Sequence, residues 1–110
     1  MSIVVPSIFS GIRRNSPEEI FETLLESRTI KIERIVSCGQ ASPKDFWYDQ
    51  EENEWVMLVK GRARLLFEGE PDPMDLQAGN YLMIPAHKRH RVEWTDPLDE
   101  TIWLAVYYRQ

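Results

Sequence analysis

The stretches that decide the fold are E-W-V-M-L-V-K-G at residues 54–61 and G-N-Y-L-M-I-P-A-H-K-R-H at residues 79–90. In each, a short run of β-branched, aromatic and other apolar residues, typical of a strand, adjoins a glycine or proline, typical of a turn. The same succession of short strand and turn extends outward over residues 29–108. Short strands at regular spacing indicate a sandwich or barrel, so the sequence predicts an all-β, mainly antiparallel fold.

Turn residues set the limits of the expected strands. Lys60-Gly61 is a two-residue hairpin signal with glycine at the second position, and residues 68–75, with two prolines, are expected to form a turn. The strands are expected at 29–37, 46–49, 54–59, 62–67, 81–84, 89–95 and 101–108.

The segment before residue 29 predicts the single helix of the chain, after a short edge strand and loop over residues 1–15. Ser16 fits an N-cap, Pro17 the first helical position and Glu19 the end of a capping box. The apolar residues that follow recur at helical spacing as far as Ser27. They are Ile20, Phe21, Leu24 and Leu25.

Length and composition limit the class of protein. A chain of 110 residues has room for one core, so residues 1–110 are expected to form a single domain: a strand and helix over 1–28 and a barrel over 29–110. The net charge of −5 argues against nucleic acid and anionic membranes as partners. The only cysteine, Cys38, permits no internal disulfide, which fits a reducing compartment. No apolar run approaches the ~20 residues that span a bilayer, and a cytoplasmic location is expected.

Two of the expected strands, 54–59 and 101–108, are apolar on both faces. A barrel strand buries only one face in its own core, so the helix, the N-terminal strand or another subunit must cover the second. One helix of three turns is too small to cover both strands. The sequence therefore predicts a homodimer.

The two quoted stretches resemble the paired motifs of the cupin superfamily. In the first cupin motif an H-x-H pair precedes a Glu, and six residues separate that Glu from a Gly; Glu54 and Gly61 have this spacing. In the second, a Gly is followed by five residues and Pro-x-Gly, then by a His; Gly79, Pro85 and His90 stand at these positions. The resemblance covers about residues 30–108 and implies an RmlC-like jelly-roll β-barrel.

The resemblance also shows where this chain departs from the family pattern. In place of the H-x-H pair stands Trp47-Tyr48-Asp49-Gln50; one spacing puts the pair on Trp47 and Asp49, the other on Tyr48 and Gln50. His87 stands where the second motif has its glycine, and Trp94 where it has its closing Asn.

Cupins with intact motifs bind a divalent metal through three imidazoles and a carboxylate. The resemblance therefore implies a site for Mn, Fe, Zn or Ni, whose donors are drawn from Asp49, Gln50, Glu54 and His90. Most of these donors are oxygen atoms, and such a set is compatible with these ions. Alternation along residues 89–95 predicts that His90 points inward together with Val92 and Trp94. A direct hydrogen bond between His90 and Glu54 would satisfy both groups without a metal, so a metal-free polar cluster remains an alternative.

Four further side chains are predicted to line a pocket for a small polar ligand: Trp47, Tyr48, His87 and Trp94. Three functions remain open. The chain is a metal-dependent enzyme with Tyr48 or His87 as acid or base, a non-catalytic ligand-binding or sensor cupin, or a scaffold whose apolar outer faces meet a partner. A fold shared by enzymes, storage proteins and regulators does not choose among them.

Overall fold

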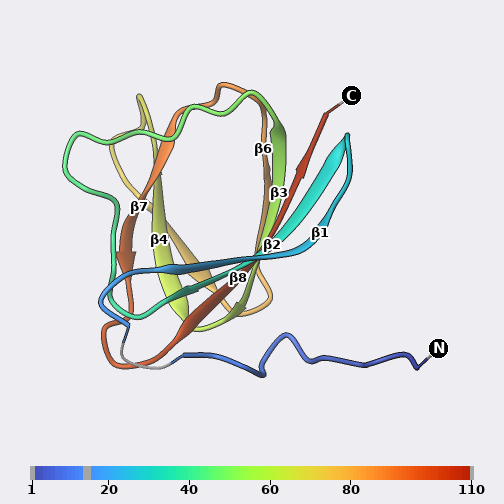
Figure 1. Ribbon diagram of the computed structural model, residues 1–110. Coiled ribbons are helices and arrows are strands. Elements are labelled where there is room, and N and C mark those ends of the chain that lie inside the picture. Colours follow the sequence, from blue (N-terminus) through green and yellow to red (C-terminus); the bar gives the residue numbers. More distant parts are fainter. Residues whose placement is uncertain (1, 14–15, 110) are drawn as a thin grey trace.

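The protein is described from a computed structural model that covers residues 2–13 and 16–109. The described residues form eight strands and no helix, so none of them lies in a helix that could cross a membrane (Figure 1). The strands are β1 (Ile20–Glu26), β2 (Ile30–Ser37), β3 (Asn53–Lys60), β4 (Arg62–Phe67), β5 (Met74–Gln77), β6 (Tyr81–Ile84), β7 (His90–Thr95) and β8 (Thr101–Tyr108). The all-β, antiparallel prediction is confirmed.

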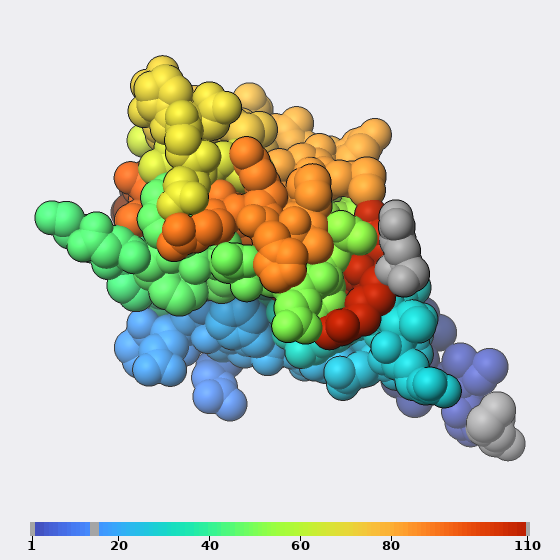
Figure 2. Space-filling view, turned by 90° about the horizontal axis from the view of Figure 1, so that it is seen from above, coloured from blue at the N-terminus to red at the C-terminus, as the bar shows by residue number. Residues whose placement is uncertain are grey.

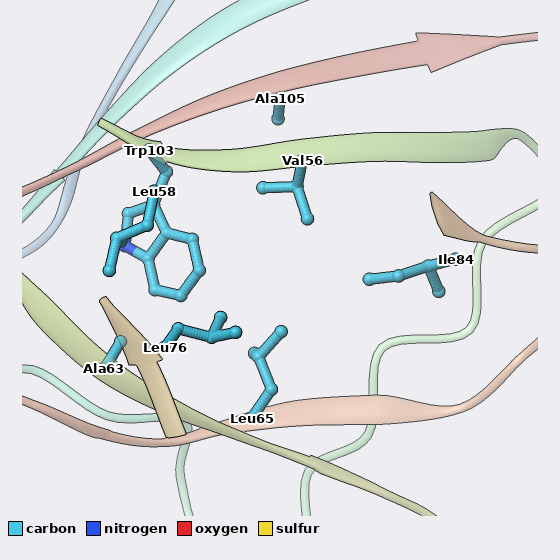
Figure 3. Packing of buried hydrophobic residues seen from close by; sticks show 8 residues of the cluster. All are labelled: Val56, Leu58, Ala63, Leu65, Leu76, Ile84, Trp103 and Ala105. Carbon is cyan, nitrogen blue, oxygen red and sulfur yellow. The ribbon is translucent and has the colours of Figure 1, made fainter. Parts of the chain in front are cut away.

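Two antiparallel sheets face each other and enclose one core. The larger has the order β1-β2-β8-β3-β6 and the smaller the order β5-β4-β7; Figure 1 shows the small sheet opposite the large one. Alternate residues of each strand point inward, and full burial of a large apolar side chain contributes about 1.5–3 kcal/mol. The buried cluster consists of Val56, Leu58, Ala63, Leu65, Leu76, Ile84, Trp103 and Ala105 (Figure 3).

The predicted N-terminal helix is wrong, because the segment forms strand β1. β1 pairs antiparallel with β2, from Ile20 opposite Val36 to Glu26 opposite Lys31. The predicted cap exists only as a local turn, in which the Ser16 hydroxyl accepts a hydrogen bond from the Glu18 amide. Isolated helices of this length are marginal, and Ile, Phe and Thr pack well in a sheet, so pairing with β2 outweighs the helical spacing. The expected edge strand is also absent from described residues 2–13.

The predicted hairpin at Lys60-Gly61 is wrong as well. β3 belongs to the large sheet and β4 to the small one, and the two strands do not pair. The chain instead bends from one sheet to the other at Gly61, whose φ is 91°. An added Cβ there would lie 2.5 Å from the Thr101 hydroxyl oxygen. The glycine of the first motif is therefore required by the close approach of β8.

Two short segments also differ from expectation. Residues 74–77, of which the first two were expected in a turn, form β5 and pair with β4. Residues 46–49 form no strand; Tyr48 makes an isolated antiparallel bridge to His90. This bridge holds the segment across one end of β7 and so places it over the barrel interior.

Candidate functional site

The candidate site is a cavity of about 60 Å³ between the two sheets. Most of its wall is apolar, from core residues such as Val56, Leu65 and Trp103. A small number of polar groups in an apolar pocket is the usual composition of a ligand site. The polar side chains that line the cavity are Tyr48, Gln50, Glu54, His90 and Tyr107.

Glu54 and His90 meet at the centre of this polar group. Glu54 lies near the start of β3 on the same face as Val56, and His90 is the first residue of β7, opposite Phe67. Both side chains are buried, and Glu54 Oε1 lies 3.7 Å from His90 Nε2. That distance is longer than a hydrogen bond. The direct bond that would make the pair self-sufficient is therefore not formed, and both groups keep capacity for a ligand.

The tautomer of His90 follows from its other ring nitrogen. His90 Nδ1 lies 2.8 Å from the carbonyl oxygen of Lys88. A carbonyl only accepts, so Nδ1 carries the proton and donates it, and Nε2 keeps its lone pair toward the cavity. Burial lowers the pKa of His90, which favours this neutral form at neutral pH.

The pKa of Glu54 is shifted in the opposite direction. Burial raises the pKa of its carboxyl to about 7; the nearby Glu33 adds to the rise, and a hydrogen bond from Gln50 Nε2, 3.1 Å from Glu54 Oε1, opposes it. Near neutral pH the carboxyl is therefore divided between its acid and its anion. A group in that state can give a proton to a ligand or take one from it.

Residues 46–50 cover the pair. The Tyr48 amide donates to the His90 carbonyl at 2.7 Å, and the Tyr48 ring stacks on the His90 ring with centroids 5.5 Å apart. Tyr48 and Gln50 therefore line the cavity, whereas the Trp47 ring lies 5.8 Å from the Arg91 guanidinium. Of the two alignments with the H-x-H pair, the structure brings only Tyr48 and Gln50 to the site.

Asp49 and His87 do not reach the cavity. The Asp49 carboxylate lies 2.7 Å from His87 Nδ1, and both side chains are largely exposed. The backbone of His87 has a φ of 63°, which lies in the left-handed region. Glycine, the residue of the motif, adopts this region without strain, and histidine is found there more often than most other residues. These two residues form a polar contact at the rim, outside the cavity.

Trp94 is also outside the cavity, because β7 contains a bulge. Val92 pairs with Leu65, and Trp94 pairs with Arg64, which directly precedes Leu65 on β4. Glu93, between Val92 and Trp94, is therefore an extra residue on β7. An extra residue reverses the alternation beyond it. Trp94 therefore lies on the outer face, where the Arg64 guanidinium is 5.0 Å from its ring.

The donors present do not fit the predicted metal site. The described residues contain no group of three or more His, Cys, Asp and Glu side chains placed to hold a metal ion. Glu54 and His90 are the two strong donors at the cavity, and Asp49 is turned away to His87. Zinc sites in proteins use at least three protein ligands, so the four predicted donors do not assemble into such a site.

Tyr107 is a site residue that the sequence analysis did not single out. It follows the buried Trp103 and Ala105 at alternate positions of β8, so its inward direction could have been predicted from that alternation. The Tyr107 hydroxyl donates to Glu33 Oε1 at 3.4 Å, and burial, followed by the nearby Glu54 and Glu33 carboxylates, raises its pKa. The phenol therefore stays protonated and is a hydrogen-bond donor at the mouth of the cavity.

A wider polar hollow adjoins the cavity at this mouth. It has a volume of about 450 Å³ and shares Gln50 and Tyr107 with the inner cavity. Charges of both signs line it, among them Arg28, Lys31 and Glu33. We call it the vestibule, because it adjoins the cavity at the two residues that both share.

The family of the chain follows from this barrel and its inward His–Glu pair together with a family model. The model for the cupin domain matches residues 35–107. The chain belongs to the cupin family. No functionally curated protein matches this cupin.

Solved cupin structures show the same fold. A protein from Ralstonia eutropha, named a candidate mannose-6-phosphate isomerase, is 46% identical, with a TM-score of 0.94 over 98% of this chain and 100% of its own. A cupin superfamily protein from Desulfitobacterium hafniense is 18% identical, with a TM-score of 0.73 over 90% of this chain and 84% of its own. An RmlC-like cupin with a double-stranded β-helix fold from Methanocaldococcus jannaschii is also 18% identical, with a TM-score of 0.69 over 88% and 85% of the two chains.

Proposed function

We propose that this cupin binds a small polar molecule in its barrel without a metal, with Glu54 and His90 as proton donor and acceptor to that molecule. The observation that supports this is the buried pair itself. Two ionisable side chains that face an apolar cavity without bonding to each other destabilise a barrel unless something uses them. Side chains with shifted pKa values in a cavity are also typical of functional sites.

The charge of the pair limits the ligand. With a neutral His90 and a partly protonated Glu54, the cavity accommodates a neutral hydroxyl or carbonyl group better than an ion. A cavity of about 60 Å³ holds only such a small group. The rest of the ligand would lie in the vestibule, where Arg28 and Lys31 can meet anionic substituents and Glu33 cationic ones.

Proton-transfer catalysis is a second candidate function. An acid with a pKa of about 7 beside an imidazole with a free Nε2 provides an acid and a base in one site, and such groups act best when their pKa lies near the working pH. Isomerisation of a hydroxy-carbonyl compound, such as a sugar, needs one group to take a proton from carbon and another to protonate oxygen. The name of the Ralstonia eutropha relative agrees with this class of reaction.

Ligand screening with paired variants tests the proposal. Compounds that raise the melting temperature of the wild type would be titrated calorimetrically into Glu54→Gln and His90→Ala, with the exposed His87→Ala as control. We expect the dissociation constant to rise by about tenfold or more for Glu54→Gln and His90→Ala, because each of these variants loses one charge-assisted or neutral hydrogen bond in a buried site. Binding to the control should be unchanged. Hits that bind all four proteins equally would place the ligand elsewhere.

Metal content gives a separate prediction. Elemental analysis of the untagged protein is expected to find far less than one equivalent of Mn, Fe, Zn or Ni, and a chelator should leave the melting temperature unchanged. The reason is that, among the described residues, only two strong donors face the cavity. One equivalent of a single metal, lost in His90→Ala without unfolding, would contradict the metal-free proposal.

The cytoplasmic location and the absence of nucleic-acid partners stay predictions from the sequence.

A further inference from the structure

The vestibule lies at the end of the barrel where three segments of the chain meet. They are the turn between β1 and β2, the segment that leads into β3, and the end of β8. Seen from above, these segments lie next to one another in cyan, green and red (Figure 2). Among the described residues, three acidic and three basic side chains line the vestibule: Glu26, Glu33, Glu52, Arg28, Lys31 and Arg109. Their numbers alone give no preference for a ligand of either charge.

Burial distinguishes one of these six charges. Glu33 is only 8% exposed, whereas the side chains of Lys31 and Arg109 are 41% and 55% exposed. A buried charge acts through a lower effective dielectric constant, while solvent weakens an exposed one. Burial raises the pKa of the Glu54 carboxyl, and the negative charge of Glu33 adds to this rise, so the field of Glu33 reaches the cavity. The inner end of the vestibule is therefore negative.

The inward direction of Glu33 follows from its place on β2. Ile35, two residues later, lines the barrel cavity, and alternate residues of a strand point to the same face. Across the sheet Glu33 is the register partner of Ala105 on β8, two residues before Tyr107. We call the junction of cavity and vestibule, formed by Gln50 and Tyr107, the neck. Glu33 thus lies on the vestibule side of the neck.

The contacts of the Glu33 carboxylate leave it capacity for a ligand. Among the described residues, the Tyr107 hydroxyl lies 3.4 Å from Oε1 and Lys31 Nζ lies 3.5 Å from Oε2. Charge-assisted hydrogen bonds are shorter, about 2.7–2.9 Å, and a carboxylate can accept at about four lone-pair sites. A buried carboxylate with such long contacts is costly, and a ligand that donates to it would offset this cost.

We propose that the ligand of this cupin is a short amino alcohol, whose hydroxyl group lies between Glu54 and His90 and whose ammonium group binds Glu33 at the neck. The inference rests on the proposed function, which supplies the hydroxyl site. An alcohol suits that site because it can donate to the free Nε2 of His90 and accept from the protonated carboxyl of Glu54. β2 and β3 flank β8, so the Cα atoms of Glu33 and Glu54 are on the order of 10 Å apart. Only a short carbon chain therefore fits between the two carboxyl groups.

Three probes that differ in one group test the inference. Ethanolamine, ethylene glycol and 3-hydroxypropanoate each carry a hydroxyl on a two-carbon chain, which ends in an ammonium, a hydroxyl or a carboxylate group. Molecules this small bind weakly, so the affinities would be measured by NMR titration at millimolar concentrations. For the wild type we expect ethanolamine to bind about tenfold more tightly than ethylene glycol, and 3-hydroxypropanoate to bind most weakly. The reason is that a hydrogen bond from an ammonium to a carboxylate is about twice as strong as a neutral one.

Variants at two vestibule residues should change this order in opposite directions. Glu33→Gln keeps the shape of the side chain and removes its charge, so it should abolish the advantage of ethanolamine and leave ethylene glycol little affected. Lys31→Met removes the cation beside Glu33 and should increase that advantage; its side chain is largely outside the core, so the fold should be kept. Glu68→Gln is the matched control. Glu68 pairs with Arg89 at 2.8 Å and lines neither the cavity nor the vestibule, so all three affinities should be unchanged.

The outcomes separate this inference from the proposed function. An equal loss of all three probes in Glu33→Gln would overturn the inference, because Glu33 would then only support the fold. Tighter binding of 3-hydroxypropanoate than of ethanolamine to the wild type would overturn it as well. Ethylene glycol reports on the proposed function by itself: if it binds the wild type and binds Glu54→Gln about tenfold more weakly, while ethanolamine has no advantage, the inference fails and the proposed function stands. If no probe binds, or all bind Glu54→Gln as tightly as the wild type, the proposed function fails too.

Discussion

Gly61→Ala is expected to lower the free energy of unfolding by about 3 kcal/mol or more, since the residue has both a left-handed backbone and no room for a side chain. Its φ of 91° costs an alanine about 1–2 kcal/mol. The added Cβ would lie 2.5 Å from Thr101 Oγ1 and 2.7 Å from the Glu100 carbonyl oxygen, and relief of such overpacking costs about 1–3 kcal/mol. These atoms belong to a buried strand end that cannot shift without disturbing β8.

Gly79→Ala separates the two causes. Gly79 has nearly the same backbone, with a φ of 96°, but nothing lies within 4 Å of the Cβ that would be added. Urea denaturation of this variant should therefore show only the backbone cost, about 1–2 kcal/mol. Equal losses in the two variants would mean that the approach of Thr101 to Gly61 does not constrain the fold.

Glu54→Gln is expected to gain about 3 kcal/mol of stability relative to the wild type as the pH is raised from about 4.5 to about 8. The pKa of Glu54 rises from its usual 4.5 to about 7 on folding. Between these values the folded state holds a proton that the unfolded state has lost, so higher pH favours unfolding until the folded carboxyl is ionised. Glutamine cannot ionise, and the variant escapes this penalty.

His90 contributes to the pH dependence of stability with the opposite sign, and this contribution remains in Glu54→Gln. Burial lowers the pKa of His90 below its usual 6.5, so the unfolded state takes up a proton first as the pH falls through 6.5. His90 therefore stabilises the protein as the pH rises toward 6.5, while Glu54 destabilises it over much of the same range. Urea denaturation between about pH 4.5 and pH 8 should show the two slopes partly cancelling in the wild type, whereas the Glu54 slope should be absent from Glu54→Gln.

A constant difference between wild type and Glu54→Gln over the whole pH range would contradict this account, because the carboxyl would then titrate as an exposed one does. The denaturant dependence of the unfolding free energy should be the same for both proteins, which checks that the substitution leaves the unfolded surface unchanged. The same variant has a second use, since it also tests ligand binding at the cavity.

Several features of this cupin could be read from local sequence. Residues 62–67, 81–84 and 101–108 form strands with the predicted bounds, because alternation and flanking turn residues act over a few neighbouring positions. The inward direction of His90 was predicted in the same way.

The sequence by itself thus determined most of the strands and the inward direction of His90, since each depends on a pattern within one strand. Tertiary structure decided the rest. Pairing with β2 made residues 20–26 a strand, the extra residue opposite β4 turned Trp94 outward, and the bridge to His90 brought Tyr48 and Gln50, not Trp47 and Asp49, to the cavity. The physical reason is common to all three: each depends on the register between segments far apart in the chain, and a shift of one residue reverses the face of every side chain that follows.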